Sequence, residues 1–223
     1  MNNLLRALPK AEICRVLAKC RPVNLDHGHI LCDAGERIRH VYFVNTGIIS
    51  LLARTAHGGT EVGMVGYEGA TGISLALGIP VSPVRLLVQS AGTAMRMNAA
   101  HFRGIARDSP ALQRALNHYL HDFIVQLTQT AACNRFHRIE SRLARWLLMT
   151  QDRMRSDEFR LTHSFLADTL GVRRVGITRI AHKLQRHGLI RYRRGHVVVI
   201  DRAGLKKIAC ECYRAIDGNS AAT

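Results

Sequence analysis

The sequence predicts an α+β protein with a β-rich domain, a long helix and a basic, mainly helical domain, in that order. Residues 21–97 carry short β-rich runs separated by glycine turns, whereas residues 112–134 carry apolar residues at helical spacing. Residues 135–223 hold 19 Lys and Arg against 8 Asp and Glu, so +11 of the net charge of +16 lies there. This asymmetry predicts a polyanionic partner, either nucleic acid or an acidic membrane surface.

The first domain is expected to span residues 1–108. Residues 4–19 predict one short amphipathic helix. The runs HVYFV, GIISLLA, VRLLVQSA and AMRM, with turns such as NTG and AHGGTE, then predict about eight short antiparallel strands. The simplest arrangement of such strands is a jelly roll, that is, a double-stranded β-helix.

Residues 109–134 are expected to form a long dimerisation helix. From Leu116 to Asn134 the apolar or small residues follow one another at alternating steps of four and three, the spacing of a coiled-coil seam. A helix packed only on its own β domain would also need an apolar stripe, so that alternative stays open. The predicted dimer contacts are Leu116, Leu120, Phe123 and Leu127.

Residues 135–223 predict a winged helix-turn-helix. In LTHSFLADTLG, Thr162 is the expected cap of a first helix and Gly171 its end. A second helix is expected from about Arg173 to His187, followed in GLIRYRRGHVVVI by a β-hairpin with a basic turn; the tail GNSAAT is expected to be disordered. The residues expected on the buried side of the second helix are Val175, Ile177, Ile180, Ala181 and Leu184.

The basic residues of this domain predict DNA binding. An arginine fork on the second helix can bind guanine in the major groove, and the hairpin suits phosphate. The expected DNA contacts are Thr162, Arg173, Arg174, Thr178, Arg179, Lys183, Arg193, Arg194 and His196. A solvated basic face, or an architectural DNA-binding protein without sequence preference, is the alternative.

The order of domains resembles the Crp/Fnr family of bacterial transcription regulators. The resemblance is carried by HVYFVNTGIISLL, RIESRLARWLL and LADTLGVRRVGITRIAHKLQRHGLI, where Arg174 and Arg179 have the spacing of the family's arginine pair. Val175 stands where many members have Glu, and Arg173 replaces a Ser cap. The resemblance implies a homodimer on a palindromic operator, with double-stranded DNA and RNA polymerase as partners.

The cyclic-nucleotide branch of the family binds its ligand through a Gly-Glu pair and an Arg followed by Ser or Thr and Ala. In GYEGATGISLALGIPVSPVRLLV the Arg position is Ser82, and Arg85 lies three residues further on, on the opposite face of a strand. A cyclic-nucleotide-responsive regulator is therefore an alternative, and the effector is expected to be unknown. The candidate effector-binding residues are Glu68, Gly69, Ser82 and Arg85.

No cofactor, metal or enzymatic activity is expected. The six cysteines, at positions 14, 20, 32, 133, 210 and 212, match no zinc spacing and lie too far apart for the iron–sulfur cluster of the oxygen-sensing branch, so they are expected to be reduced, incidental thiols. A cupin-type metal enzyme would have only His27, His29 and Glu36 as candidate ligands, at the wrong spacing, and His118 and His121 are expected to be solvated. The longest uncharged run, Gly69 to Val84, is too short to span a membrane, so a cytoplasmic protein is expected.

Overall fold

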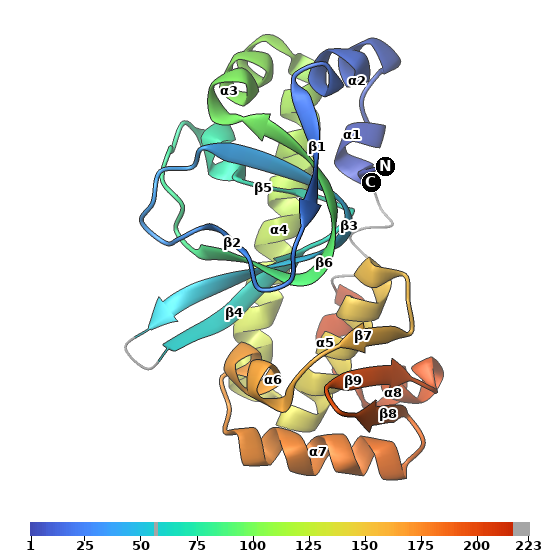
Figure 1. Ribbon diagram of the computed structural model, residues 1–223. Helices are drawn as coiled ribbons and strands as arrows, with labels where there is room; N and C mark the ends of the chain where they lie inside the picture. Colours follow the sequence, from blue (N-terminus) through green and yellow to red (C-terminus); the bar gives the residue numbers. More distant parts are fainter. Residues whose placement is uncertain (56–57, 216–223) are drawn as a thin grey trace. The chain divides into compact units, whose positions relative to one another are not determined.

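The computed structural model describes residues 1–55 and 58–215 (Figure 1). The chain forms two compact units. Residues 1–53 and 64–124 form the first unit, and residues 54–63 and 125–223 form the second. The boundary between them falls inside the predicted dimerisation helix, and the tail GNSAAT, expected to be disordered, lies outside the described residues.

The first unit opens with two short helices, α1 (Asn3–Arg6) and α2 (Lys10–Leu17). The single helix predicted over residues 4–19 is therefore wrong. Pro9 separates the two helices and is the N-cap of α2, because proline lacks the N–H that a continuous helix would need there. Asn2 caps α1 and is fully buried, and its Nδ2 donates to the carbonyl oxygens of Val44 and Gly69, both at 2.7 Å.

The β-roll, which lies mostly in the first unit, is one antiparallel sheet, which the described residues build from six strands (Figure 1). Its main path is β1-β6-β3-β4, with β2 paired to β6 and β5 paired to β3. The antiparallel roll was predicted, but with more and shorter strands. The elements are β1 (Cys20–Leu25), β2 (Ile30–Cys32), β3 (His40–Thr55), β4 (Gly58–Val65), β5 (Ala70–Thr71), the 3₁₀ helix η1 (Ile73–Leu77), β6 (Arg85–Asn98) and helix α3 (Ala99–Asp108).

The predicted turn NTG is a bulge inside strand β3. The pairing of β3 with β6 shifts register between Val44 and Ile48, and the strand then continues. Gly47 has φ 85°, and a Cβ there would lie 2.6 Å from the carbonyl oxygen of Ser90, so a side chain does not fit. The predicted turn AHGGTE includes residues 56–57, which lie outside the described residues.

Helix α4 (Pro110–Phe136) corresponds to the predicted dimerisation helix. Leu116 is 1% exposed in the single chain and is not available to a second chain, so its prediction as a dimer contact is wrong. Leu116 belongs to the apolar side of α4 that is buried within the same chain. Leu120, Phe123 and Leu127 are partly exposed, and Ile124, which was not predicted, is 59% exposed.

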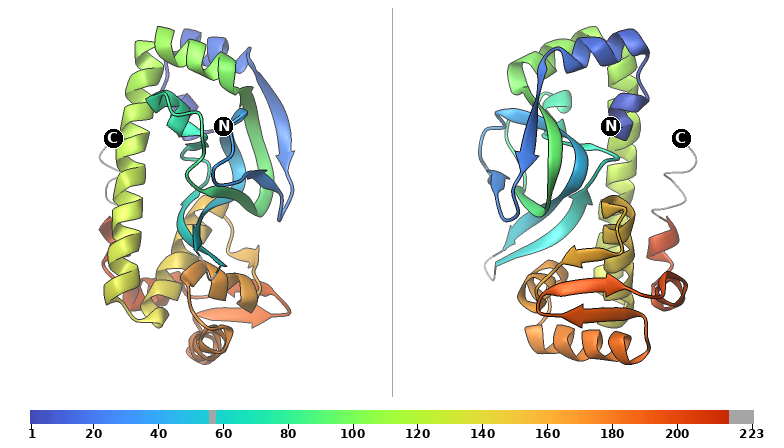
Figure 2. Two further views of the ribbon diagram at one scale, coloured as in Figure 1. Left: turned by 90° about the vertical axis from the view of Figure 1, so that its left-hand side faces the viewer. Right: turned by 45° about the vertical axis from the view of Figure 1, so that its right-hand side comes forward.

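The second unit contains a winged helix-turn-helix, as predicted. Its three-stranded sheet has the order β7-β9-β8, and β7 was not foreseen. Figures 1 and 2 show helix α7 on the outer side of this unit, covered on its inner side only. The elements are α5 (Ile139–Met154), β7 (Glu158–Arg160), α6 (His163–Leu170), α7 (Arg174–Arg186), β8 (Ile190–Arg193), β9 (His196–Val199) and α8 (Arg202–Ile208).

Residues 54–63 are joined to this unit by two side-chain hydrogen bonds. The indole Nε1 of Trp146 donates to Oε1 of the buried Glu61 at 2.7 Å. The hydroxyl of Thr60 donates to the carbonyl oxygen of Thr169 at 3.2 Å. Within residues 1–55 and 58–215, no helix is long and apolar enough to cross a membrane.

Candidate nucleic-acid interface

Helices α6 and α7 meet at the turn that the sequence predicts. Thr162 caps α6, since its Oγ1 accepts a hydrogen bond from the backbone N–H of Phe165 at 3.1 Å. Gly171 ends the helix in the left-handed region at φ 62°, a conformation that glycine adopts without strain. Helix α7 then begins after its N-cap, Arg173, so the turn fixes where the second helix starts.

The inner face of α7 is apolar. Ile177, Ile180, Ala181 and Leu184 are buried. Val175 was predicted on this face but is 79% exposed, so that prediction is wrong. Two residues along an α-helix correspond to about 200° of rotation, and Val175 therefore lies on the side opposite to Ile177.

The outer face of α7 is centred on Val175 and is otherwise basic. Arg179, His182 and Arg186 are exposed and follow Val175 at steps of four, three and four, which place them on one side of a helix. His182 and Arg186 were missed by the sequence analysis, although this spacing could have revealed them. Arg174 flanks the same face, and within the described part of the chain neither Arg174 nor Arg179 forms an ion pair.

Two other predicted DNA contacts already have partners in the protein. The ammonium group of Lys183 lies 2.8 Å from Oε2 of Glu140 on α5 and forms a partly exposed ion pair with it. The hydroxyl of Thr178 donates to the carbonyl oxygen of Arg174 and lies 3.0 Å from Nδ1 of His163. Both side chains lie at the edges of the exposed face.

The hairpin presents two arginines at its tip. Arg194 and Gly195 have φ angles of 50° and 80°, as the tight turn between β8 and β9 requires. Arg193 and Arg194 are exposed at this turn. His196 is also exposed, but its Nδ1 lies 3.6 Å from Oε1 of Glu158, which competes with a phosphate contact.

His163 links the start of α6, helix α7 and the hairpin. Its ring stacks on Tyr192 with 4.2 Å between the ring centroids, and the hydroxyl of Tyr192 donates to the carbonyl oxygen of Leu161 at 2.9 Å. Burial lowers the pKa of His163, and the positive charges of Arg174 and His182 act in the same direction. Through Tyr192 and Thr178, the His163 ring therefore connects the hairpin to helix α7.

The predicted effector residues do not form one site. A cavity of about 60 Å³ in the first unit is lined by Ser82 and by mostly apolar side chains, including Phe123 of α4. Arg85 does not line it and instead binds Asp33 through two hydrogen bonds of 3.1 and 2.7 Å. Glu68 does not line it either; its Oε1 accepts from the N–H of Gly66 at 3.0 Å.

The cavity also differs from a nucleotide site. Gly69, the remaining predicted effector residue, lies directly against the ring of Tyr119 and leaves no space for a ligand there. Among the described residues no charged side chain lines the cavity, and ligand pockets usually hold about 300–1,000 Å³. Among the described residues, His27, His29 and Glu36 are not gathered into a metal-binding group.

Residues 141–208 match the Crp-like helix-turn-helix domain family. The sequence matches no curated protein. The c-di-GMP responsive global regulator CLP of Xanthomonas campestris is 19% identical with a TM-score of 0.71, over 86% of this chain and 100% of that one.

Two further solved structures share the fold. The FixK2 protein of Bradyrhizobium japonicum is 14% identical with a TM-score of 0.73, over 86% of this chain and 98% of that one. A Crp/Fnr-family transcriptional regulator of Thermus thermophilus is 20% identical with a TM-score of 0.69, over 85% and 98%. The chain thus joins a Crp-like helix-turn-helix domain, over residues 141–208, to the fold of these regulators.

Proposed function

We propose that the protein acts as a homodimer that reads a palindromic operator with helix α7 of each protomer. The outer face of α7 carries this proposal, because it is exposed along its whole length and combines arginines with one apolar side chain. The major groove of DNA admits one such helix, and its base edges offer both hydrogen-bond acceptors and the thymine methyl group. Catalysis has no part in this function.

Each side chain of the face has a distinct proposed role. Arg174 and Arg179 donate in pairs to guanine, and Val175 contacts a thymine methyl group. Arg193 and Arg194 of the hairpin bind phosphate, which positions the protein without reading sequence. Arg173 and Thr162 lie at helix N-termini, where backbone N–H groups add to phosphate binding.

The proposed dimer contact is a strip on helix α4 that partly replaces the predicted seam. Leu120, Ile124, Leu127 and Ala131 follow one another at steps of four, three and four, and each is at least partly exposed. Ile124 is the most exposed large apolar side chain of the strip, at 59%. A two-fold axis beside this strip would present two copies of α7 to half-sites about one DNA turn apart.

The proposed role of the β-roll is to shift the spacing of the two reading helices in response to an effector of unknown identity. The absence of a cation from the lining of the cavity does not favour a cyclic nucleotide, since a cyclic phosphate needs a fixed positive charge. The operator-bound dimer would then act on RNA polymerase in the bacterial cytoplasm.

Selection of binding sites from a random duplex library tests the proposal. The purified full chain should enrich a palindrome whose half-sites are about one helical turn apart at physiological salt. Enrichment of a single half-site would contradict the homodimer. Tight, strongly salt-dependent binding with no enriched sequence would instead establish an architectural DNA-binding protein.

A further inference from the structure

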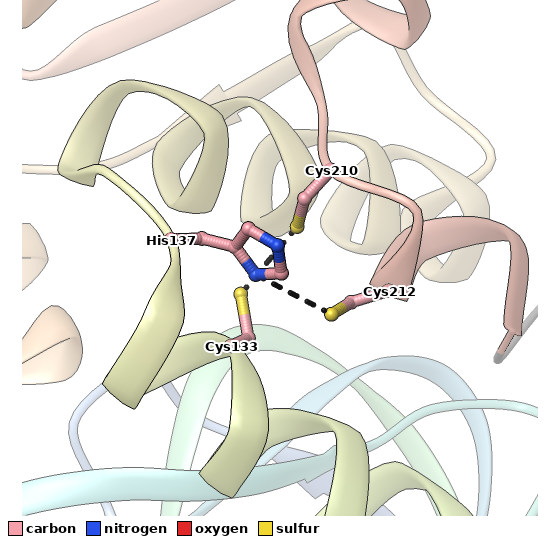
Figure 3. A group of neighbouring side chains, drawn as sticks. All are labelled: Cys133, His137, Cys210 and Cys212. Atoms are coloured by element: carbon pink, nitrogen blue, oxygen red, sulfur yellow. Dashed lines mark hydrogen bonds between the residues drawn. The ribbon is translucent and has the colours of Figure 1, made fainter.

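Three cysteines and a histidine from two distant parts of the sequence meet in the second unit (Figure 3). The donor atoms of Cys133, His137, Cys210 and Cys212 all lie within 4.8 Å of one another. The sulfur atoms of Cys133 and Cys210 are 3.5 Å apart, and the sulfur of Cys212 is 3.6 Å from Nδ1 of His137. The three cysteines are buried, whereas the histidine is partly accessible from solvent.

These distances are those of a ligand set around a single zinc ion. Zinc–sulfur bonds of about 2.3 Å and zinc–nitrogen bonds of about 2.0–2.1 Å in a tetrahedron give edges of about 3.8 Å between sulfurs and about 3.6 Å between sulfur and nitrogen. Three cysteines and one histidine are also a usual composition of structural zinc sites. An iron–sulfur cluster would hold its ligands farther apart, because they bind different iron atoms.

Each pair of ligands is positioned by local structure. Cys133 and His137 lie one turn apart at the end of α4, where the backbone N–H of His137 donates to the carbonyl oxygen of Cys133 at 3.1 Å. Residues four apart on a helix present their side chains on the same side. Cys210 and Cys212 follow α8 in a turn that the N–H of Tyr213 closes on the carbonyl oxygen of Cys210, also at 3.1 Å.

The two pairs are brought together by contacts that do not involve the cluster. Arg202 of α8 donates to Oδ1 of Asp152 on α5 at 2.7 Å and to the hydroxyl of Tyr213 at 2.8 Å. The same hydroxyl donates to Oδ2 of Asp152 at 2.9 Å. These bonds hold the segment after α8 in place, so the site is largely formed before any metal binds.

The orientation of the histidine ring also suits a metal. Nε2 of His137 lies 3.0 Å from Oε1 of Glu211 and Nδ1 lies on the side of the thiols, so the tautomer with its proton on Nε2 directs the lone pair of Nδ1 toward them. A carboxylate that accepts from the outer nitrogen is the usual second partner of a zinc-bound histidine. Thiols that pack only as small apolar groups would not require this arrangement.

The charges around the cluster are complementary to a metal–thiolate complex. Three thiolates, a neutral imidazole and Zn²⁺ together carry one negative charge. Two buried guanidinium groups, those of Arg142 and Arg145, interact electrostatically with the thiols. In the part of the chain that the structure describes, neither arginine pairs with a carboxylate, so the complex would supply the missing counter-charge.

We propose that Cys133, His137, Cys210 and Cys212 bind one Zn²⁺ in a closed, structural site. Each thiol releases its proton to solvent as its sulfur bonds the metal, and no oxidant or reductant is needed. The ion joins the end of α4 and the connection to α5 with the segment after α8. It thereby stabilises the unit that carries α7, since a ligand that binds only the folded state favours folding.

The test measures metal content, so it does not depend on the proposed DNA readout. The full chain is freed of metal with a chelator under reducing conditions and titrated with Zn²⁺ against a chromophoric competitor. We expect one zinc per chain and a higher melting temperature of the zinc-bound protein. Co²⁺ in place of Zn²⁺ should give the visible and near-ultraviolet bands of a tetrahedral site with three thiolates.

Matched variants locate the site. Cys133→Ser and His137→Gln should lose the zinc, whereas Cys14→Ser and His118→Ala, which change an exposed cysteine and an exposed histidine elsewhere, should keep it. Glu211→Gln should weaken zinc binding about 10- to 100-fold without removing a ligand. This last variant decides the question if Cys133→Ser does not fold.

Four results would overturn the proposal. The folded, reduced protein would take up no zinc, or would retain it equally in Cys133→Ser and His137→Gln. It would contain iron with acid-labile sulfide instead of a single ion. Alternatively, Glu211→Gln would bind zinc as tightly as the unmodified chain.

Discussion

The exposed valine on helix α7 allows a sharp test of base readout. Val175 is 79% exposed, so almost its whole side chain is available to DNA and little of it stabilises the fold. Val175→Ala removes two methyl groups, each worth about 0.8 kcal/mol when buried. If both are buried against a thymine methyl group, the loss is about 1.6 kcal/mol per half-site, or about 15-fold in affinity.

The assay compares two proteins on two DNA duplexes. The duplexes carry thymine or uracil at the contacted position of one half-site and therefore differ by one methyl group. Uracil lacks one methyl group, worth about 0.8 kcal/mol when buried, so it should weaken binding of the unmodified protein about fourfold and should hardly affect Val175→Ala, because the contact is already lost. The melting temperature of the variant should be unchanged, since an exposed substitution shifts stability by less than about 0.5 kcal/mol.

An equal loss of affinity for both proteins on uracil, or no loss for either, would contradict a contact between Val175 and a thymine methyl group.

A second variant tests the same position from the opposite direction. Val175→Glu introduces the carboxylate that many similar regulators have at this position, and a carboxylate accepts a hydrogen bond from N4 of cytosine. This variant should therefore shift the preferred base from thymine to cytosine in the same binding assay.

Three further predictions concern the other parts of the proposed mechanism. Arg174→Ala should relax preference at one base pair by about 1–3 kcal/mol. Arg194→Ala should instead weaken binding to all sequences alike and reduce the slope of log affinity against log salt concentration by about 0.9 per phosphate contact. The opposite pattern in binding titrations would contradict these roles. Ile124→Ala should weaken the dimer at least about tenfold in sedimentation equilibrium, since two copies meet at a two-fold axis, and His118→Ala, off the strip, should not; equal association would count against the strip. Because burial lowers the pKa of His163, protonation favours the unfolded chain, and the melting temperature should fall as pH drops through about 6.5. The melting temperature of His163→Gln should fall less between about pH 7.5 and 5.5. Parallel curves of melting temperature against pH for the two proteins would disprove this.

The helix-turn-helix could be predicted from sequence because its signals are local. The hydroxyl of Thr162 reaches a backbone N–H three residues away, and Gly171 supplies a left-handed conformation at the point where the helix ends. The turn at Arg194 and Gly195 is local in the same sense. In each case the residue type and its immediate neighbours suffice to determine the backbone.

Other features depend on which surface an element meets, and here the predictions were less accurate. Gly47 looks like a turn residue, but pairing with the distant strand β6 keeps β3 extended through a bulge. Some apolar residues of α4 are buried and others are exposed, so a single seam drawn through them included the buried Leu116 and omitted the exposed Ile124. Val175 was placed inside because valine is apolar, although its angular position on α7 is opposite to Ile177.

The cysteine cluster shows why a chemical site can escape a search by spacing. Cys133 and His137 are separated by one helical turn, and Cys210 and Cys212 by one residue, and neither pair resembles the paired motifs of zinc fingers. The pairs lie more than 70 residues apart. They are brought together by Arg202 of α8, which bonds Asp152 on α5 and Tyr213 beyond α8. A tetrahedral metal site constrains only the positions of four donor atoms. It does not fix how far apart in the sequence the residues that carry these atoms lie. The same freedom explains why Arg174 and Arg179 of α7 could be singled out from the sequence and this cluster could not: a helix is continuous in sequence, and a metal site need not be.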